Sequence, residues 1–87
     1  MNFVDTAFNK TNRYSIGREA ETGLYYLSIP VTNQLADYEE YYEISAEMHN
    51  SYPANSLLRD EFADRCRKRL NDALLIQQPG QSRGVAT

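Results

Sequence analysis

Residues 37–44 are the part of the chain whose residue types could do chemistry, because they combine carboxylates with aromatic rings. The run Asp-Tyr-Glu-Glu-Tyr-Tyr-Glu-Ile packs four acids and three tyrosines into eight residues. Tyr favours β-strands whereas Asp and Glu disfavour them, so a strand with this much uncompensated charge indicates a docking face for a cationic partner. We predict that this partner-binding face consists of Asp37, Glu39, Glu40, Tyr41, Glu43 and Tyr26.

The same carboxylates also admit plainer or different interpretations. The run could be a solvated outer face whose charges only protect a sheet edge from aggregation. Glu39 and Glu43 project from one strand face towards a possible cation, but calcium and magnesium sites need more oxygen ligands from a shaped loop, and no such pattern occurs. A glycosidase-like carboxylate pair would need a cleft that so small a domain hardly offers. We therefore predict no metal, no cofactor and no enzyme activity.

The single histidine and the single cysteine are the other candidates for base or nucleophile. Cys66 lies on a predicted apolar helical stripe, where a free cysteine behaves as a small buried hydrophobe. His49 lies beside Asn50 and is predicted to be a surface or helix-end residue. A catalytic Cys–His pair would require an exposed, ionisable thiol, so we do not expect one.

A basic run at residues 65–69 is the second charge feature, with the cations Arg65, Arg67, Lys68 and Arg69. These side chains could contact phosphates, which makes a small nucleic-acid-associated regulator an alternative function. A helix end also attracts cations through its dipole, acids lie one turn earlier, and the chain as a whole is acidic. We therefore favour a solvated helix face over a nucleic-acid site.

Three predicted strands position the acidic run. The strongest, residues 24–31, directs Tyr25, Leu27, Ile29 and Val31 to the core at period two and Tyr26, Ser28 and Pro30 to the other face. An earlier strand at 14–20 contains Gly17, which indicates a bulge or a close backbone approach. The acidic strand follows, with Tyr38, Tyr42 and Ile44 facing the core beside Glu40.

Two helices are predicted after the strands. Ser45 is a good N-cap for a short helix that ends by Tyr52, before Pro53. The main helix is predicted over 56–71, with an apolar stripe of Leu58, Phe62, Cys66, Leu70 and Leu74, widened by Leu57 and Ala63. Residues 74–77 read as a short fourth strand or as the helix end, and residues 1–12 as a loosely ordered arm or a short edge strand. Residues 79–87 read as a flexible tail.

Together these elements predict one α+β domain over residues 1–87: a three- to four-stranded antiparallel sheet packed against one long amphipathic helix, plus a short helix. The 41% hydrophobic and 24% charged content is typical of a globular fold. No stretch is long and apolar enough for a membrane span, no secretory signal is visible, and one cysteine allows no internal disulfide, so we expect a cytoplasmic protein. Residues 1–50 hold three bases and eight acids, so the acidic pole is N-terminal.

Three segments in order resemble small bacterial immunity proteins, which neutralise toxins encoded beside them. They are Gly-Leu-Tyr-Tyr-Leu-Ser-Ile-Pro-Val from residue 23, the acidic run with its following serine, and residues 66–84. The resemblance implies stoichiometric occlusion of a basic toxin domain, often a nuclease, in the cytoplasm, and it carries over no individual residue. The partner we expect is therefore a basic protein, with no membrane and no nucleic acid, and a homodimer is possible. An accessory subunit of an oligomeric enzyme remains a further alternative.

Overall fold

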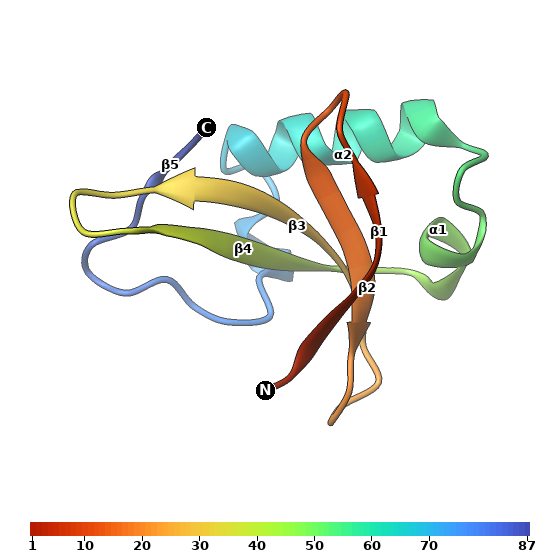
Figure 1. Cartoon of the computed structure of the whole chain (residues 1–87), viewed down its shortest axis with the longest axis horizontal. Helices are drawn as coiled ribbons and strands as arrows, with labels where there is room; N and C mark the ends of the chain where they lie inside the picture. The colour runs from red at the N-terminus through yellow and green to blue at the C-terminus, as the bar shows by residue number, and fades with distance from the viewer.

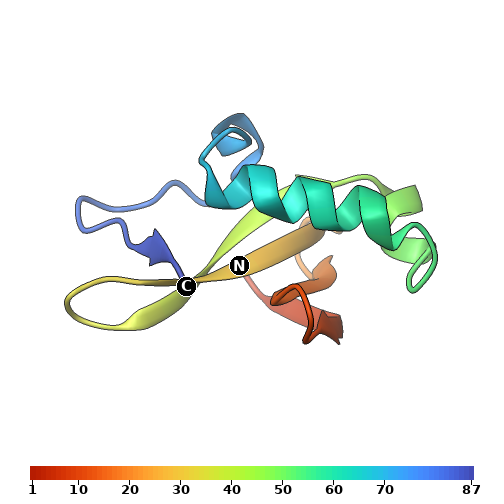
Figure 2. The same ribbon diagram turned by 90° about the horizontal axis from the view of Figure 1, so that it is seen from above.

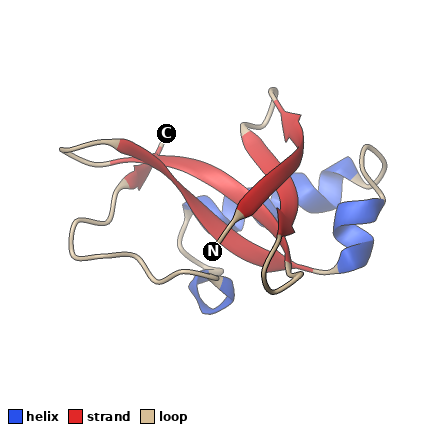
Figure 3. Cartoon of the chain, turned by 60° about the horizontal axis from the view of Figure 1, so that its bottom comes forward, coloured by secondary structure: helices blue, strands red, loops and turns tan.

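Four successive strands form an antiparallel meander in the computed structural model, which describes residues 1–87. β1 (Phe3–Asn9), β2 (Tyr14–Glu19), β3 (Tyr25–Thr32) and β4 (Asp37–Ile44) are neighbours in that order, and β5 (Val85–Ala86) pairs with β3. The hairpins β1–β2 and β3–β4 run across one another, as Figure 1 and Figure 3 show. The predicted α+β fold with an antiparallel sheet is confirmed.

The helical elements are α1 (Ala46–Asn50), α2 (Ser56–Arg67) and the single 3₁₀ turn η1 (Asp72–Leu74). As predicted, Ser45 caps α1, and its Oγ accepts a hydrogen bond from the Met48 amide at 3.1 Å. Figure 2 shows α2 along one side of β3 and β4, with β1 on the other side. One sheet face is therefore covered by α2, and we call the opposite one the open face.

The period-two pattern predicted for the strands is confirmed on the side covered by α2. Most alternate apolar residues of β3 and β4 lie there and lose nearly all contact with water, which makes them the main apolar contribution to stability, whereas Tyr25 and Tyr38 are half-buried. The hydrophobic core consists of Tyr14, Ile16, Leu27, Ile29, Val31, Tyr42, Ile44, Ala63, Cys66 and Leu75.

The apolar stripe predicted for the main helix is confirmed only in part: Ala63 and Cys66 are buried and Phe62 packs against the core, whereas the leucines do not. α2 ends at Arg67, four residues early, and Arg69 then takes the left-handed conformation with φ 61°. The side chains that α2 buries belong to Arg59, Ala63 and Cys66. The leucines of the predicted stripe are largely exposed: Leu57, Leu58, Leu70 and Leu74.

Arg59 takes the place in the core that a leucine was expected to fill. Its guanidinium donates to the carbonyl oxygens of Met48 (3.1 Å) and Ala54 and to the Ser51 hydroxyl (3.2 Å). It also lies 5.0 Å from the centre of the Tyr52 ring. A buried cation without a carboxylate partner is tolerated here because carbonyl dipoles and a ring face replace its hydration. Arg59 thereby ties α2 to α1 and to the loop between them.

Both chain ends are more ordered than predicted. Residues 3–9 form the edge strand β1, the second of the two possibilities for the N-terminal arm. Residues 74–77 contribute one isolated bridge, between Leu75 and Tyr42, rather than a full strand. The last residues have specific partners, unlike the flexible tail that we predicted: Gly84 N donates to the Tyr38 hydroxyl at 2.6 Å, and β5 follows at once. A Cβ at Gly84 would collide with the Thr32 backbone, so the tail lies tightly against β3.

Candidate functional site

The open face of the sheet carries acids and aromatic rings and no basic residue. Strand register places the following side chains on it: Phe3, Asp5 and Phe8 of β1; Ser15, Gly17 and Glu19 of β2; Tyr26, Ser28 and Pro30 of β3; Asp37, Glu39, Tyr41 and Glu43 of β4. Five of these residues are carboxylic acids. The structure therefore brings five of the six predicted site residues onto the open face, namely Asp37, Glu39, Tyr41 and Glu43 of β4 and Tyr26 of β3.

An aromatic cluster of Phe3, Tyr26 and Tyr41 lies at the centre of the open face. The Phe3 and Tyr41 rings stack with centroids 3.7 Å apart and planes 9° apart. Tyr26 meets both rings edge-on, at 5.4 Å from Phe3 and 5.0 Å from Tyr41. The stack connects the first strand of the meander to the last, so the sheet is curled across this face.

Tyr26 lies beneath the other two rings of this cluster and is fully buried, which corrects its prediction as a partner-binding residue. Its ring passes over Gly17, where any Cβ would collide with the Tyr26 hydroxyl and the Val4 carbonyl, so the predicted close approach at Gly17 is confirmed. The Tyr26 hydroxyl donates to Asp5 Oδ1 at 2.6 Å. Burial, and then this bond to Asp5, raise the pKa of Tyr26. Tyr26 thus supports the rings above it.

Glu39 is half-buried beside the cluster, and it has one hydrogen-bond partner. The Ser28 hydroxyl donates to its Oε1 at 3.0 Å. Burial raises the pKa of the Glu39 carboxyl, the Ser28 bond opposes this rise, and the negative charge of Asp5 adds to it. None of the ion pairs in the structure involves Asp5, Asp37, Glu39 or Glu43. The negative charge of the face is therefore not neutralised within the molecule.

Glu19 also belongs to the open face by register, but it is saturated by local hydrogen bonds. Its carboxylate accepts from the Thr22 hydroxyl (2.6 Å), and from the backbone amides of Thr22, Glu21 and Asn2. These bonds, with the Thr22 hydroxyl first, lower the pKa of Glu19 to about 2. The side chain closes the β2–β3 turn, where Gly23 has φ 76°, and has no lone pair left for a partner.

Glu40 was predicted as a binding residue, and the structure corrects this. Its side chain lies on the face covered by α2 and is 6% exposed. It accepts from Arg83 Nε at 2.8 Å, from Arg83 Nη2 at 3.1 Å and from the Tyr42 hydroxyl at 2.8 Å. Arg83 also donates to both carboxylate oxygens of Asp72, at 2.7 and 2.8 Å. The Arg83 bonds lower the pKa of Asp72. Glu40 therefore anchors the C-terminal segment and cannot reach a partner.

Phe3 and Asp5 belong to the face and were missed by sequence reasoning. The N-terminal arm showed no clear period, because a β-bulge interrupts its alternation between Asp5 and Ala7. The available signal was local: Phe3 and Asp5 are two residues apart, the spacing that puts two side chains on one strand face. Before the bulge, β1 repeats in short form the acidic and aromatic composition of β4.

The basic residues at positions 65–69, where α2 ends, are divided between structural and exposed positions. Arg67 pairs with Asp64 at 3.0 Å and donates to the backbone carbonyls of Asn12 and Arg13. Arg69 donates to the Gly84 carbonyl at 3.1 Å. Only Arg65 and Lys68 of the predicted phosphate-binding group are left as exposed cations without such contacts.

Other sites considered from the sequence have little structural basis. Cys66 is buried, and burial raises the pKa of its thiol to about 12, so its thiolate is scarce at neutral pH. No cluster of three or more His, Cys, Asp or Glu side chains is arranged to hold a metal ion. None of the helices has the length and apolar character needed to cross a bilayer.

Comparisons with known proteins add no family to this geometry. No family model, no curated protein and no solved structure matches the chain.

Proposed function

We propose that this protein binds a cationic protein surface through the open face of its sheet and so neutralises that partner. One observation carries the proposal: the open face holds carboxylates from β1 and β4 around a preformed aromatic cluster, and no cation of the chain itself pairs with Asp5, Asp37, Glu39 or Glu43.

The electrostatic part of the argument concerns association. Like charges on one face repel each other, which disfavours the free protein and is relieved when a basic surface docks. Complementary charge speeds the encounter and disfavours acidic partners. Docking of a cation should stabilise Glu39 more than the other acids, because its half-buried carboxylate carries a desolvation cost with only Ser28 to offset it.

The aromatic part of the argument concerns dissociation. Phe3 and Tyr41 are held in one arrangement by their mutual stack and by Tyr26 beneath them. Rings that are already immobile lose little conformational entropy on binding, so a larger share of their contact energy becomes affinity. Half-buried aromatic side chains at the centre of a charged rim match the usual composition of an interface hot spot.

A cavity at the rim of the face lies beside Glu39. It measures about 170 Å³ and lies between residues 38–41 of β4 and residues 77–80. A long basic side chain of the partner could enter it and reach the Glu39 carboxylate, while its methylene groups contact Tyr41 and Pro79. The partner class follows from the resemblance to immunity proteins: a basic toxin domain, such as a nuclease, whose working surface the open face would cover.

The decisive experiment begins with capture of the partner. The tagged protein is used as bait in its native lysate at low and high salt, and retained proteins are identified by mass spectrometry. The proposal predicts a basic protein in stoichiometric amount. Affinity for it is then measured for the parent and for Glu39→Lys combined with Glu43→Lys, for which we expect a loss of about 100-fold, mostly in the association rate.

A matched control separates the effect of charge on the open face from the effect of the total charge of the protein. Glu47 and Glu61 are exposed acids on α1 and α2, and Glu47→Lys combined with Glu61→Lys changes the total charge by the same amount. The control should bind within a few-fold of the parent. Equal loss in both double variants, or no loss in the first, would show that the open face is not the binding site.

A further inference from the structure

A hydroxyl, an imidazole and a carboxamide form a hydrogen-bonded chain at the edge of the sheet next to α1. Thr6 Oγ1 lies 2.7 Å from His49 Nε2, and His49 Nδ1 lies 2.7 Å from Asn50 Oδ1. Thr6 comes from β1, and the other two residues end α1. The order of atoms is that of a nucleophile, a base and the group that orients the base.

A β-bulge directs Thr6 towards His49. Thr6 is the extra residue of the β1 bulge, because its neighbours Asp5 and Ala7 pair with the adjacent residues Gly17 and Ile16. Bulges redirect side chains and leave the extra residue without a ladder partner, and they are frequent next to active sites.

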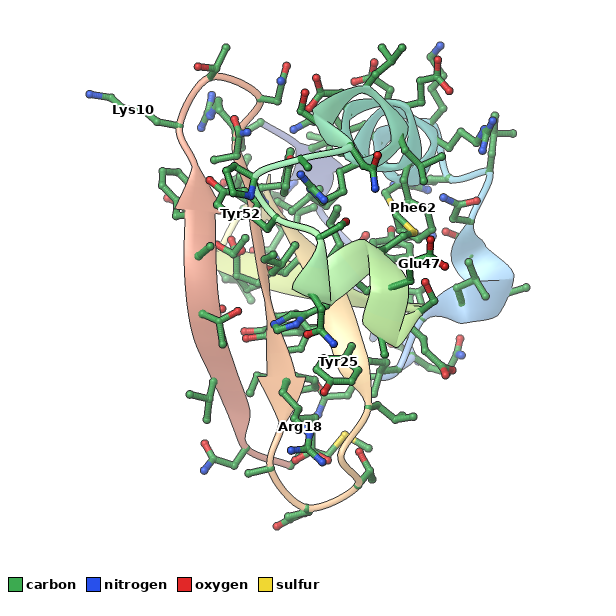
Figure 4. All side chains as sticks on the ribbon, turned by 90° about the vertical axis from the view of Figure 1, so that its right-hand side faces the viewer. Lys10, Arg18, Tyr25, Glu47, Tyr52 and Phe62 are labelled. Atoms are coloured by element: carbon green, nitrogen blue, oxygen red, sulfur yellow. The ribbon has the colours of Figure 1, made fainter.

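The imidazole is held from its other side. The His49 ring packs on the Tyr25 ring with centroids 4.5 Å apart. The Arg18 guanidinium lies 5.5 Å from the centre of the same Tyr25 ring, and Figure 4 shows these two side chains together below α1. The ring contact restricts rotation of the imidazole, so His49 stays directed at Thr6.

The hydrogen bonds determine where the protons lie. The Asn50 carbonyl oxygen can only accept, so His49 Nδ1 carries a proton. In the neutral imidazole, Nε2 then has a free lone pair, and the Thr6 hydroxyl is the donor that faces it. The Ile16 carbonyl is a competing acceptor for that hydroxyl, but it lies farther away, at 3.2 Å against 2.7 Å.

We propose that Thr6 is a nucleophile for acyl transfer, with His49 as its general base and Asn50 as a positioning residue. Thr6 Oγ1 attacks the carbonyl carbon of an ester while its proton passes to His49 Nε2. The tetrahedral adduct then expels the alcohol or phenol, which takes the proton from His49, and an acyl ester of Thr6 remains. Water attacks that ester by the same proton route, releasing the acid and restoring the hydroxyl.

Because no pocket holds the substrate at this site, we expect reaction only with activated esters that have a good leaving group. Thr6 and Asn50 are exposed, and neither of the two main cavities of the molecule includes them. General-base assistance supplies about 100-fold or more, so the reaction should be slow but specific to Thr6. This activity is separate from the proposed binding function, because the open face uses none of these three side chains.

The test uses the full chain with p-nitrophenyl acetate as the probe. We expect one acetyl group per chain on Thr6, localised by fragmentation mass spectrometry and formed together with a burst of p-nitrophenol. Thr6→Val should abolish the Thr6 adduct, and Thr6→Ser should retain it. His49→Gln should slow its formation about 100-fold.

Two further measurements distinguish loss of the fold from loss of the chemical contribution of a side chain. Asn50→Ala should slow acetylation, and Asn50→Asp should restore it, because Asp retains an oxygen that accepts from Nδ1. Thermal unfolding of every variant shows whether the fold persists. Acetylation confined to the amines of Met1, Lys10 and Lys68 would overturn the proposal, and so would an unchanged Thr6 rate in folded His49→Gln.

Discussion

Glu39 and Glu40 are neighbours of the same type on one strand, and they have opposite environments. Glu40 is 6% exposed and accepts from Arg83 and Tyr42, so its charge is buried and compensated. Glu39 faces the other side, is only half-buried, and has the Ser28 hydroxyl as its one partner. One carboxylate stabilises the fold, and the other has no charged partner within the chain.

The difference shows that the role of an acid depends on whether the fold brings a cation to it. Arg83, 43 residues away from Glu40 in the sequence, reaches the covered face because the chain returns there as β5. No basic residue lies on the open face. The same strand therefore serves as a structural anchor on one side and as a candidate interface on the other.

The largest difference in the free energy of unfolding should be seen between two single variants, each of which lacks one of these two acids. Glu40→Ala removes one of the two carboxylates that pair with the partly buried Arg83, which keeps Asp72, so we expect a cost of about 3 kcal/mol, the low end for breaking a buried pair. Glu39→Ala removes a partly desolvated charge and should change stability by less than about 1 kcal/mol. Urea denaturation of both variants measures the contrast. Similar losses would mean that the two faces are energetically alike.

A smaller contrast is expected between two buried tyrosines. The Tyr42 hydroxyl donates to Glu40 at 2.8 Å inside the core, and the Tyr26 hydroxyl donates to Asp5, which water also reaches. Tyr42→Phe should cost about 2 kcal/mol, because a charged acceptor loses a buried donor, and Tyr26→Phe about 1 kcal/mol. The free energy of unfolding, measured in urea, shows which of the two substitutions costs more. A larger loss for Tyr26→Phe would place the more important polar contact on the open face.

The smallest expected effect is a pH dependence due to Glu39. Its pKa in the folded protein is raised above 4.5 by burial, so the folded state binds the proton more tightly than the unfolded state. The resulting stabilisation is complete below pH 4.5 and is lost as the pH rises through the folded pKa.

Glu39→Gln removes this dependence and should gain stability relative to the parent as the pH rises, by less than about 1 kcal/mol, because solvent screens a half-exposed group. Urea midpoints of both proteins between pH 4 and 7 are the measurement. The opposite trend would show that the Ser28 bond outweighs desolvation at Glu39.

Much of the fold follows from local patterns in the sequence. Alternation in β3 and β4 identified which of their side chains face the core, since a strand directs successive residues to opposite sides. The Ser45 cap identified the start of α1. The α2 stripe was predicted correctly for Ala63 and Cys66 and wrongly for its leucines, because the face that is actually buried carries Arg59. Side-chain polarity alone does not reveal that carbonyl groups will satisfy a guanidinium.

What the sequence by itself determined is therefore the strand faces, the fold class and the acidic composition of β4. The tertiary structure decided that Glu40 pairs with Arg83, that Tyr26 is buried, that Phe3 stacks on Tyr41, and that Thr6 meets His49. All four depend on contacts between segments far apart in the chain. Local periodicity specifies on which side of a strand a residue lies, whereas chain topology specifies what lies opposite it.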